Sequence, residues 1–326
     1  MGTNIITDRP IVEPRSHPIY TGKYMLATNE INRMYEKVIW WLSKRTPGGL
    51  IYGRPRIGKT RAIKLMMQQL PIELGSKLQI FLIICRQYKT ANENVFFEDL
   101  LRNVNHSEPS RGTASAKRDR LFNHLYYKGQ SSEEKRIVMI IDEAQHLHDS
   151  HFGWLMDVYN ELDRVNIDMS VILVGQEEEL EGKKGALKNA SKSQIIGRFM
   201  VHEHKFSGIK NIDDLKTCIT GYDEESEYPN DSGCTYTQYF FPKLYENGFR
   251  LYQYAEDLFE AFNNIRQREK IYGPIEIPMQ YLTSTIEYLL IHYGADGEDI
   301  DQLTKDQLEE SILYSGYVEQ LFNPVV

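Results

Sequence analysis

Cysteine is scarce in this chain of 326 residues, which contains only Cys85, Cys218 and Cys234. The three lie far apart and show no paired spacing, so we expect no disulfide framework. This pattern suits a reducing compartment better than secretion. A content of 41% hydrophobic and 26% charged residues is typical of a globular protein that folds around an apolar core without cross-links.

Long apolar runs are also missing. No run approaches the roughly 18 to 20 residues that a membrane-spanning helix requires. The first 18 residues are polar, contain three prolines and lack the apolar segment of a signal peptide, so we expect an extended arm over residues 1–19. These absences predict a cytoplasmic protein with no membrane contact.

Positive charge is not in excess, because the formal net charge is -8 at pH 7. Proteins that coat nucleic acid without sequence preference are usually basic, so this balance counts mildly against such a role. It does not exclude a local basic surface, since counterion release depends on the charges in contact and not on their total.

The most informative stretch is Gly53–Thr60, which has the spacing Gly-x-x-x-x-Gly-Lys-Thr of a phosphate-binding loop. An apolar strand pattern precedes it and a helical pattern follows, which is the required order. We expect Lys59 to neutralise the β- and γ-phosphates of ATP and the Thr60 hydroxyl to bind Mg²⁺. The predicted nucleotide-binding residues of this stretch are Gly53, Arg54, Pro55, Arg56, Ile57, Gly58, Lys59, Thr60 and Arg61.

A second stretch, Arg136–Gln145, places two carboxylates after five consecutive apolar residues. In open α/β sheets, ligands bind beyond the carboxyl ends of the strands, so we expect Asp142 and Glu143 beside the loop. Asp142 is predicted to hold Mg²⁺ and Glu143 to act as the general base that activates water.

Apolar strands alternate with helical patterns over the first two thirds of the chain, which predicts a parallel sheet. A helix is expected over Ile31–Leu42 with Thr28 as its N-cap, and a polar segment over Glu108–Arg120. The expected strands after the loop are Leu78–Cys85, buried on both faces, then Ile137–Ile141, Ser170–Gln176, and a fifth opening at Arg198–Val201. Gln176 would face the γ-phosphate at its strand tip.

From Ser207 onward the sequence predicts helices, interrupted by an acidic, loop-like insertion over Gly221–Gly233. We therefore predict an arm (1–19), a nucleotide-binding core (20–206) and a helical lid with a tail (207–326). Arg250 follows a glycine at the start of an amphipathic helix, from which the lid could deliver it to the nucleotide.

In chain order, these motifs resemble those of the AAA+ ATPases, which implies an α/β P-loop NTPase core with a five-stranded parallel sheet and a C-terminal helical lid. In that family's terms they are Walker A, Walker B, sensor 1, an arginine finger and sensor 2, at Gly53–Thr60, Asp142 with Glu143, Gln176, Arg198 and Arg250. The phrases Tyr52–Arg61, Ile141–Leu147 and Val174–Gln176 resemble more narrowly the TnsC-type regulators of bacterial DNA transposition.

That resemblance implies an ATPase using ATP and Mg²⁺ that assembles with its own copies on double-stranded DNA as a ring or helical filament. It would link a TniQ-like target-selection protein to transposase subunits of the TnsA and TnsB type. Glu143, Lys59, Gln176 and Arg198 would be catalytic, with Arg198 acting on a neighbour's γ-phosphate; Arg164 or the pair Lys183 and Lys184 are alternative fingers. In the rings of that family, loops that follow the second strand line the central pore. The resemblance therefore implies DNA contacts by Arg86, Lys89, Thr90, Arg111, Lys117 and Arg118.

Two other functions fit the same motifs. One is a different AAA+ machine, such as a helicase loader or a replication initiator. The other is a signalling switch that binds ATP without DNA.

Overall fold

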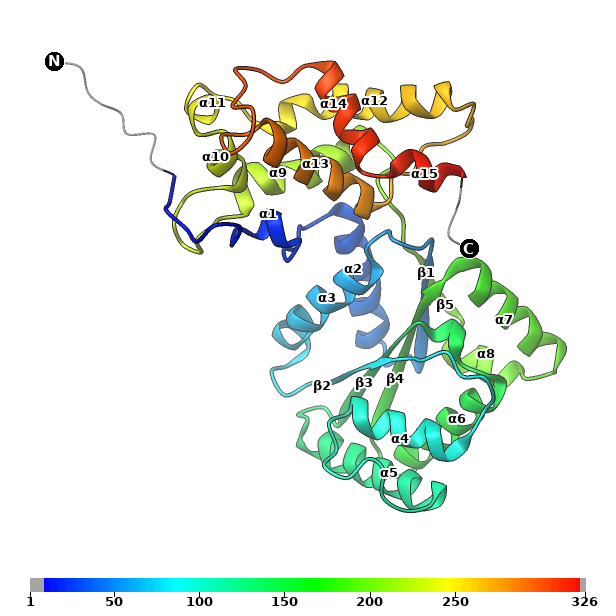
Figure 1. The fold of residues 1–326 in the computed structure, drawn as a ribbon. Coiled ribbons are helices and arrows are strands. Elements are labelled where there is room, and N and C mark those ends of the chain that lie inside the picture. Colours follow the sequence, from blue (N-terminus) through cyan, green and yellow to red (C-terminus); the bar gives the residue numbers. More distant parts are fainter. Residues whose placement is uncertain (1–8, 323–326) are drawn as a thin grey trace. The chain divides into compact units, whose positions relative to one another are not determined.

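The chain folds into two units, each with its own hydrophobic core. The computed structural model describes residues 9–322 (Figure 1). The sheet unit comprises Arg33–Arg54 and Lys59–Phe206. The helical unit comprises Pro55–Gly58 and the described parts of Met1–Asn32 and Ser207–Val326.

The predicted domain division can be compared with these two units. Residues 20–32, which the sequence analysis placed with the nucleotide-binding core, group with the helical unit. Residues 1–8 of the predicted arm and 323–326 of the predicted tail lie outside the described residues.

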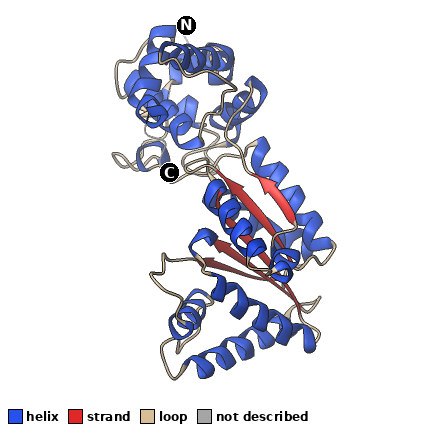
Figure 2. Cartoon of the chain, turned by 90° about the vertical axis from the view of Figure 1, so that its right-hand side faces the viewer, coloured by secondary structure: helices blue, strands red, loops and turns tan. Residues whose placement is uncertain are grey.

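Five parallel strands form the centre of the sheet unit, in the order β2-β3-β4-β1-β5. They are β1 (Gly48–Gly53), β2 (Gln79–Ile84), β3 (Arg136–Asp142), β4 (Asp168–Gln176) and β5 (His202–Lys205). The aliphatic runs of β3 and β4 are buried, because helices cover the sheet (Figure 2). The predicted α/β fold with a five-stranded parallel sheet is confirmed.

Helix α2 (Asn29–Ser43), which begins in the other unit, precedes β1, and the other helices of this unit lie between successive strands in the chain. They are α3 (Lys59–Leu74), α4 (Glu93–Asn103), α5 (Ala114–Ser131), the short η1 (Ala144–His146), α6 (Asp149–Arg164), α7 (Glu177–Asn189) and α8 (Ser193–Phe199). The predicted N-cap is confirmed, since the Thr28 hydroxyl accepts the Ile31 N–H over 3.2 Å.

Strand β2 is less buried than predicted. Four of its residues are half-buried and Ile84 is 59% exposed. The expectation of burial on both faces was wrong because β2 lies at the edge of the sheet order, where less of the structure covers it.

The fifth strand begins later than predicted. Arg198 and Phe199 end helix α8, in which Ile195 and Phe199 form a buried pair four residues apart. Strand pairing starts at His202, opposite Gly49 of β1. The apolar pair Phe199 and Met200 therefore fills the core from a helix end and not from a strand.

Helix α5 begins inside the segment that was predicted to be a polar loop. Thr113 caps it, because its hydroxyl accepts the Ala116 N–H over 3.3 Å. Lys117 lies in the first turn of α5 and is buried, although most of the residues around it in this segment are exposed or half-buried.

The helical unit packs its helices around an aromatic-rich core. They are α1 (Pro18–Thr21), α9 (Ile212–Thr220), η2 (Gly221–Glu225), α10 (Tyr236–Phe240), α11 (Pro242–Glu246), η3 (Leu251–Tyr254), α12 (Ala255–Arg268), α13 (Met279–Tyr293), α14 (Lys305–Tyr314) and α15 (Tyr317–Phe322). Within the described part of the chain, no helix combines the length and apolarity needed to cross a membrane.

The start of the acidic insertion is structured and not a solvated loop. Asp223 is fully buried in the π-helical turn η2. Its carboxylate accepts the N–H groups of Leu251 and Tyr252, each over 2.9 Å, and so caps η3. Burial raises the pKa of Asp223, while these two hydrogen bonds oppose that rise.

His17 ties the chain preceding α1 into the helical unit. Its ring is fully buried, and Nδ1 accepts the Ile19 N–H over 3.2 Å. The rings of Tyr228, Tyr236, Tyr239 and Phe240 surround it with centroids 4.5 to 5.0 Å away. Nε2 has no hydrogen-bond partner. Burial lowers the pKa of His17 to about 4, with Asp296 raising it and Arg9 lowering it further.

We predict that His17 makes folding pH-dependent. Its pKa is about 4 in the folded chain against 6.5 ordinarily, so between these values the unfolded chain binds the extra proton. The free energy of unfolding should then fall by about 1.4 kcal/mol per pH unit as pH drops below 6.5, or about 2 kcal/mol at pH 5.

Urea unfolding of the wild type and His17→Asn at pH 7 and pH 5 tests this, since Asn keeps an acceptor but does not titrate. The wild type should lose more stability between the two pH values than the variant. Equal losses would contradict the assignment.

Candidate nucleotide site

The loop Arg54–Gly58 joins the end of β1 to the start of α3. Two of its residues have left-handed backbone angles, with φ of 63° at Arg56 and 103° at Gly58. The second value strains any side chain, which explains the glycine. Pro55–Gly58 belongs to the helical unit, and within that unit Arg56 contacts α13: the Gln280 N–H donates to Arg56 O over 3.2 Å and Arg56 Nη1 donates to the Tyr281 hydroxyl over 2.8 Å. These contacts hold Arg56 in its strained conformation.

Lys59 opens α3 and points back to its own loop. Its Nζ donates to the carbonyl oxygens of Gly53 and Arg54, each over 2.8 Å. Burial lowers the pKa of Lys59, and the carboxylates of Glu143 and Asp142 oppose that effect. That this ammonium binds the phosphates of a nucleotide stays a prediction.

Thr60 and Asp142 meet although 82 positions separate them. The Thr60 hydroxyl donates to Asp142 Oδ2 over 2.8 Å. Asp142 ends β3 and is buried, which raises its pKa, while the Thr60 hydroxyl and the Glu143 N–H lower it. A hydroxyl and a carboxylate side by side are the hard oxygen ligands that Mg²⁺ prefers, so the two residues fit this metal.

Glu143 turns the chain sharply after β3, with φ of 56° and ψ of 38°. Its carboxylate accepts the Gln145 side-chain amide over 2.5 Å. Gln176 ends β4 and is in register with Gly53, where the loop begins. The sheet therefore brings Lys59, Thr60, Asp142, Glu143 and Gln176 to one edge.

Residues 44–183 match a family model described as an AAA domain. The matched span includes the phosphate-binding loop, Asp142, Glu143 and Gln176. No curated protein sequence matches the chain.

Solved structures show the same fold. The ORC2 protein of Aeropyrum pernix in its ADP form is 15% identical, with 95% of this chain and 72% of that chain covered and a TM-score of 0.52. The ADPNP-ADP complexes of that protein give 12% identity, 92% and 71% coverage and a TM-score of 0.50. At these identities the likeness concerns the fold alone.

The sheet unit holds the candidate arginine finger, Arg198, in contacts with its own chain. Arg198 Nη1 donates to Asn160 Oδ1 over 2.9 Å, and its guanidinium carbon lies 4.4 Å from the centroid of the Tyr159 ring. Of the alternatives, Lys183 donates to Leu147 O and Lys184 pairs with Glu203, whereas Arg164 is exposed at the end of α6.

Arg250 belongs to the helical unit and is engaged there. Its guanidinium lies 3.4 Å from the centroid of the Tyr245 ring. Nη1 donates to the carbonyl oxygens of Tyr245 and Phe249, over 3.0 and 2.7 Å. A contact with nucleotide would require Arg250 to exchange these bonds, so its role stays a prediction.

The residues predicted to contact DNA separate into two kinds. Lys117 is buried and its ammonium pairs with Glu98 over 2.6 Å, so it does not reach the surface on which the prediction placed it. Arg118 pairs with Glu93 and Arg86 with Asp99. Exposed residues among them are Arg86, Lys89, Thr90 and Arg111, of which Arg111 pairs with Glu108.

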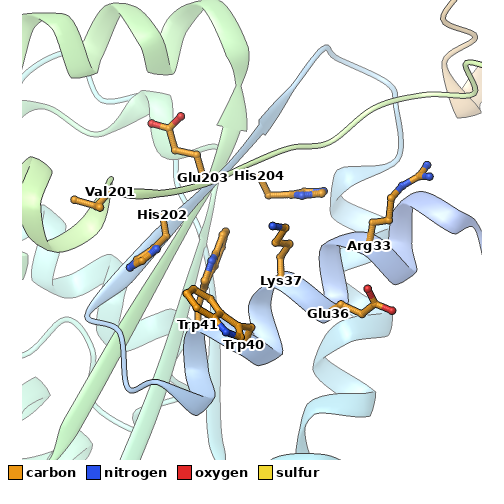
Figure 3. A pocket seen from close by; sticks show the side chains of 9 residues that line it. All are labelled: Arg33, Glu36, Lys37, Trp40, Trp41, Val201, His202, Glu203 and His204. Atoms are coloured by element: carbon orange, nitrogen blue, oxygen red, sulfur yellow. The ribbon is translucent and has the colours of Figure 1, made fainter.

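A groove of about 560 Å³ in the sheet unit lies between α2 and β5 (Figure 3). It is lined by Arg33, Glu36, Lys37, Trp40, Trp41, Val201, His202, Glu203 and His204. Trp40 and Val201 are 53% and 57% exposed there. The groove contains no residue predicted to bind nucleotide, so it is separate from the loop site.

We predict that Lys59→Ala abolishes tight nucleotide binding. Truncating one member of a buried charge pair costs roughly 2 to 5 kcal/mol, so the affinity should fall at least about 30-fold. Titration with a fluorescent ATP analogue measures the change. Lys64→Ala, an exposed lysine on the same helix, is the matched control and should bind as the wild type does. Equal affinities for both variants would contradict the site.

Proposed function

We propose that this AAA domain hydrolyses ATP. The observation that carries the proposal is the hydrogen bond of 2.8 Å between Thr60 and Asp142, with Glu143 next in the chain. Lys59 would bind the β- and γ-phosphates, Thr60 and Asp142 would hold Mg²⁺, and Gln176 would orient the γ-phosphate or the water. The metal would supply charge neutralisation on the phosphates when bound.

Glu143 is the proposed base. Its carboxylate would accept a proton from the attacking water as the oxygen approaches phosphorus. The Asp142 carboxylate accepts hydrogen bonds from the Thr60 hydroxyl and the Glu143 N–H. We therefore assign the proton of the attacking water to the carboxylate of Glu143. The two neighbouring acids thus divide the metal and base roles.

Glu143→Gln should keep nucleotide affinity and stop turnover. The amide is nearly the same shape but cannot take the proton, and general-base catalysis contributes about 10² to 10⁴-fold. Phosphate release and binding of a labelled ATP analogue are measured side by side. Turnover close to the wild-type rate would show that Glu143 is not the base.

We further propose that the ATP-bound protein assembles on double-stranded DNA and regulates transposition. The support is the resemblance of three phrases around the loop, Asp142 and Gln176 to TnsC-type regulators. Assembly would place Arg198, or Arg164, against a neighbour's γ-phosphate. The assembled protein would then present a TniQ-like target selector to TnsA- and TnsB-like transposase subunits.

We propose that the DNA contacts come from the exposed residues among the predicted ones. Lys89, Thr90 and Arg111 are exposed and remain candidates, as does Arg86, whose side chain is exposed beside Asp99. Such residues bind phosphate oxygens without reading sequence. The buried Lys117 is no longer among them.

Electron microscopy of the protein with duplex DNA and a slowly hydrolysed ATP analogue should show rings or filaments around DNA. Binding should weaken steeply between 50 and 200 mM salt, because phosphate contacts release counterions. The Lys89→Ala and Arg111→Ala double variant should reduce the salt slope, with Lys64→Ala as the control. Absence of DNA-bound assemblies at low salt would favour a signalling switch without DNA.

A replication initiator or helicase loader is the second candidate. The fold it shares with the ORC2 protein of Aeropyrum pernix favours it. Capture experiments on the assembled protein separate the two. A TniQ-like protein or a transposase would be retained by a transposition regulator, and a replicative helicase by a loader.

A further inference from the structure

Gln145 is a buried side chain that uses both ends of its amide. Nε2 donates to Glu143 Oε2 over 2.5 Å, and Oε1 accepts the Gln176 N–H over 3.2 Å. A backbone N–H can only donate and an ionised carboxylate can only accept, so these two partners fix which way the amide points. Gln145 therefore bridges the Glu143 carboxylate and the end of β4.

The turn after β3 makes this bridge possible. Glu143 is left-handed, and the His146 N–H donates to Glu143 O over 3.0 Å to close the short helix η1. This reversal brings the side chain of Gln145 back to the residue two positions before it. A left-handed residue with a side chain costs about 1 to 2 kcal/mol, so the surrounding contacts must hold it in place.

Gly175 provides the space for the amide. A Cβ at this position would overlap Gln145 Oε1 and come within 2.8 Å of Leu180 Cδ1. Gly175 lies inside β4, where glycine weakens a strand, and it is not among the residues with positive φ. The glycine is required here for space and not for its backbone angles.

We propose that Gln145 is a positioning residue for hydrolysis, an inference that rests on Glu143 being the base. By occupying Oε2, Gln145 holds the carboxylate in one orientation and leaves Oε1 to accept the proton from water. Its second bond ties that carboxylate to Gln176, which pairs with Gly53 where the nucleotide loop begins. The base is thereby held relative to the loop through two neighbouring side-chain and backbone contacts.

Gln145→Met tests the proposal, because methionine is similar in length but makes neither hydrogen bond. Turnover number should fall about tenfold or more, as for other residues that orient a reacting group, while nucleotide affinity stays within about twofold. Gly175→Ala should also lower the turnover number while leaving nucleotide affinity nearly unchanged, because it keeps Gln145 but fills the space that its amide occupies. Gln69→Ala, an exposed glutamine on α3, is the matched control and should turn over as the wild type does.

A double-mutant cycle separates positioning from a merely structural role. In the Glu143→Gln background, single-turnover rates should show no further loss on adding Gln145→Met, because the group being positioned is gone. Additive losses, an unchanged or raised turnover number in Gln145→Met, or a loss of nucleotide affinity equal to the loss of turnover would each overturn the inference.

Failure of the proposed function can be distinguished from failure of the role proposed for Gln145. If Glu143→Gln itself turns over at the wild-type rate, the ATPase assignment of Glu143 fails and this inference fails with it. If Glu143→Gln is inactive while Gln145→Met turns over normally, only the role of Gln145 is overturned.

Discussion

Parallel pairing of β1, β4 and β3 is the constraint on which the candidate site depends. Because the three strands run the same way, their carboxyl ends meet at one edge, with Gly53 opposite Gln176 and Asp142 one strand further on. Strand β3 has seven residues and spans about 20 Å, so reversing it would carry Asp142 that far from Thr60. The contact between Thr60 and Asp142 is therefore a product of topology as much as of the two side chains.

The sequence predicted the parts of the site that depend on local spacing or on that topological rule. The loop and its lysine and threonine follow from a fixed pattern, and Asp142 and Glu143 follow from the rule that ligands bind at strand ends. No role was predicted for Gln145, because its contact with Glu143 depends on a left-handed backbone conformation, which the sequence does not predict at a glutamate. The combination of that amide with Gly175 could have been noticed only with the strands placed side by side.

Other errors share one cause, which is that composition reports polarity and not position. The segment around Lys117 reads as a basic loop, yet Glu98 accepts hydrogen bonds from Lys117, Arg102 and Ser110. These bonds lower the pKa of Glu98 to about 2. Basic residues here help join α4 to α5, so fewer of them are available to a phosphate backbone than a count of lysine and arginine suggests. Similarly, Arg198 was read as part of a strand because its apolar neighbours look alike in both settings.

The setting of His17 has a practical meaning for how this protein is handled. A chain shortened to begin after His17 would leave a hollow lined by Tyr228, Tyr236, Tyr239 and Phe240, open where the imidazole had been. Exposing these four aromatic rings would create an apolar surface patch that promotes aggregation. Shortened variants should therefore keep both His17 and Arg9, whose guanidinium pairs with Asp296.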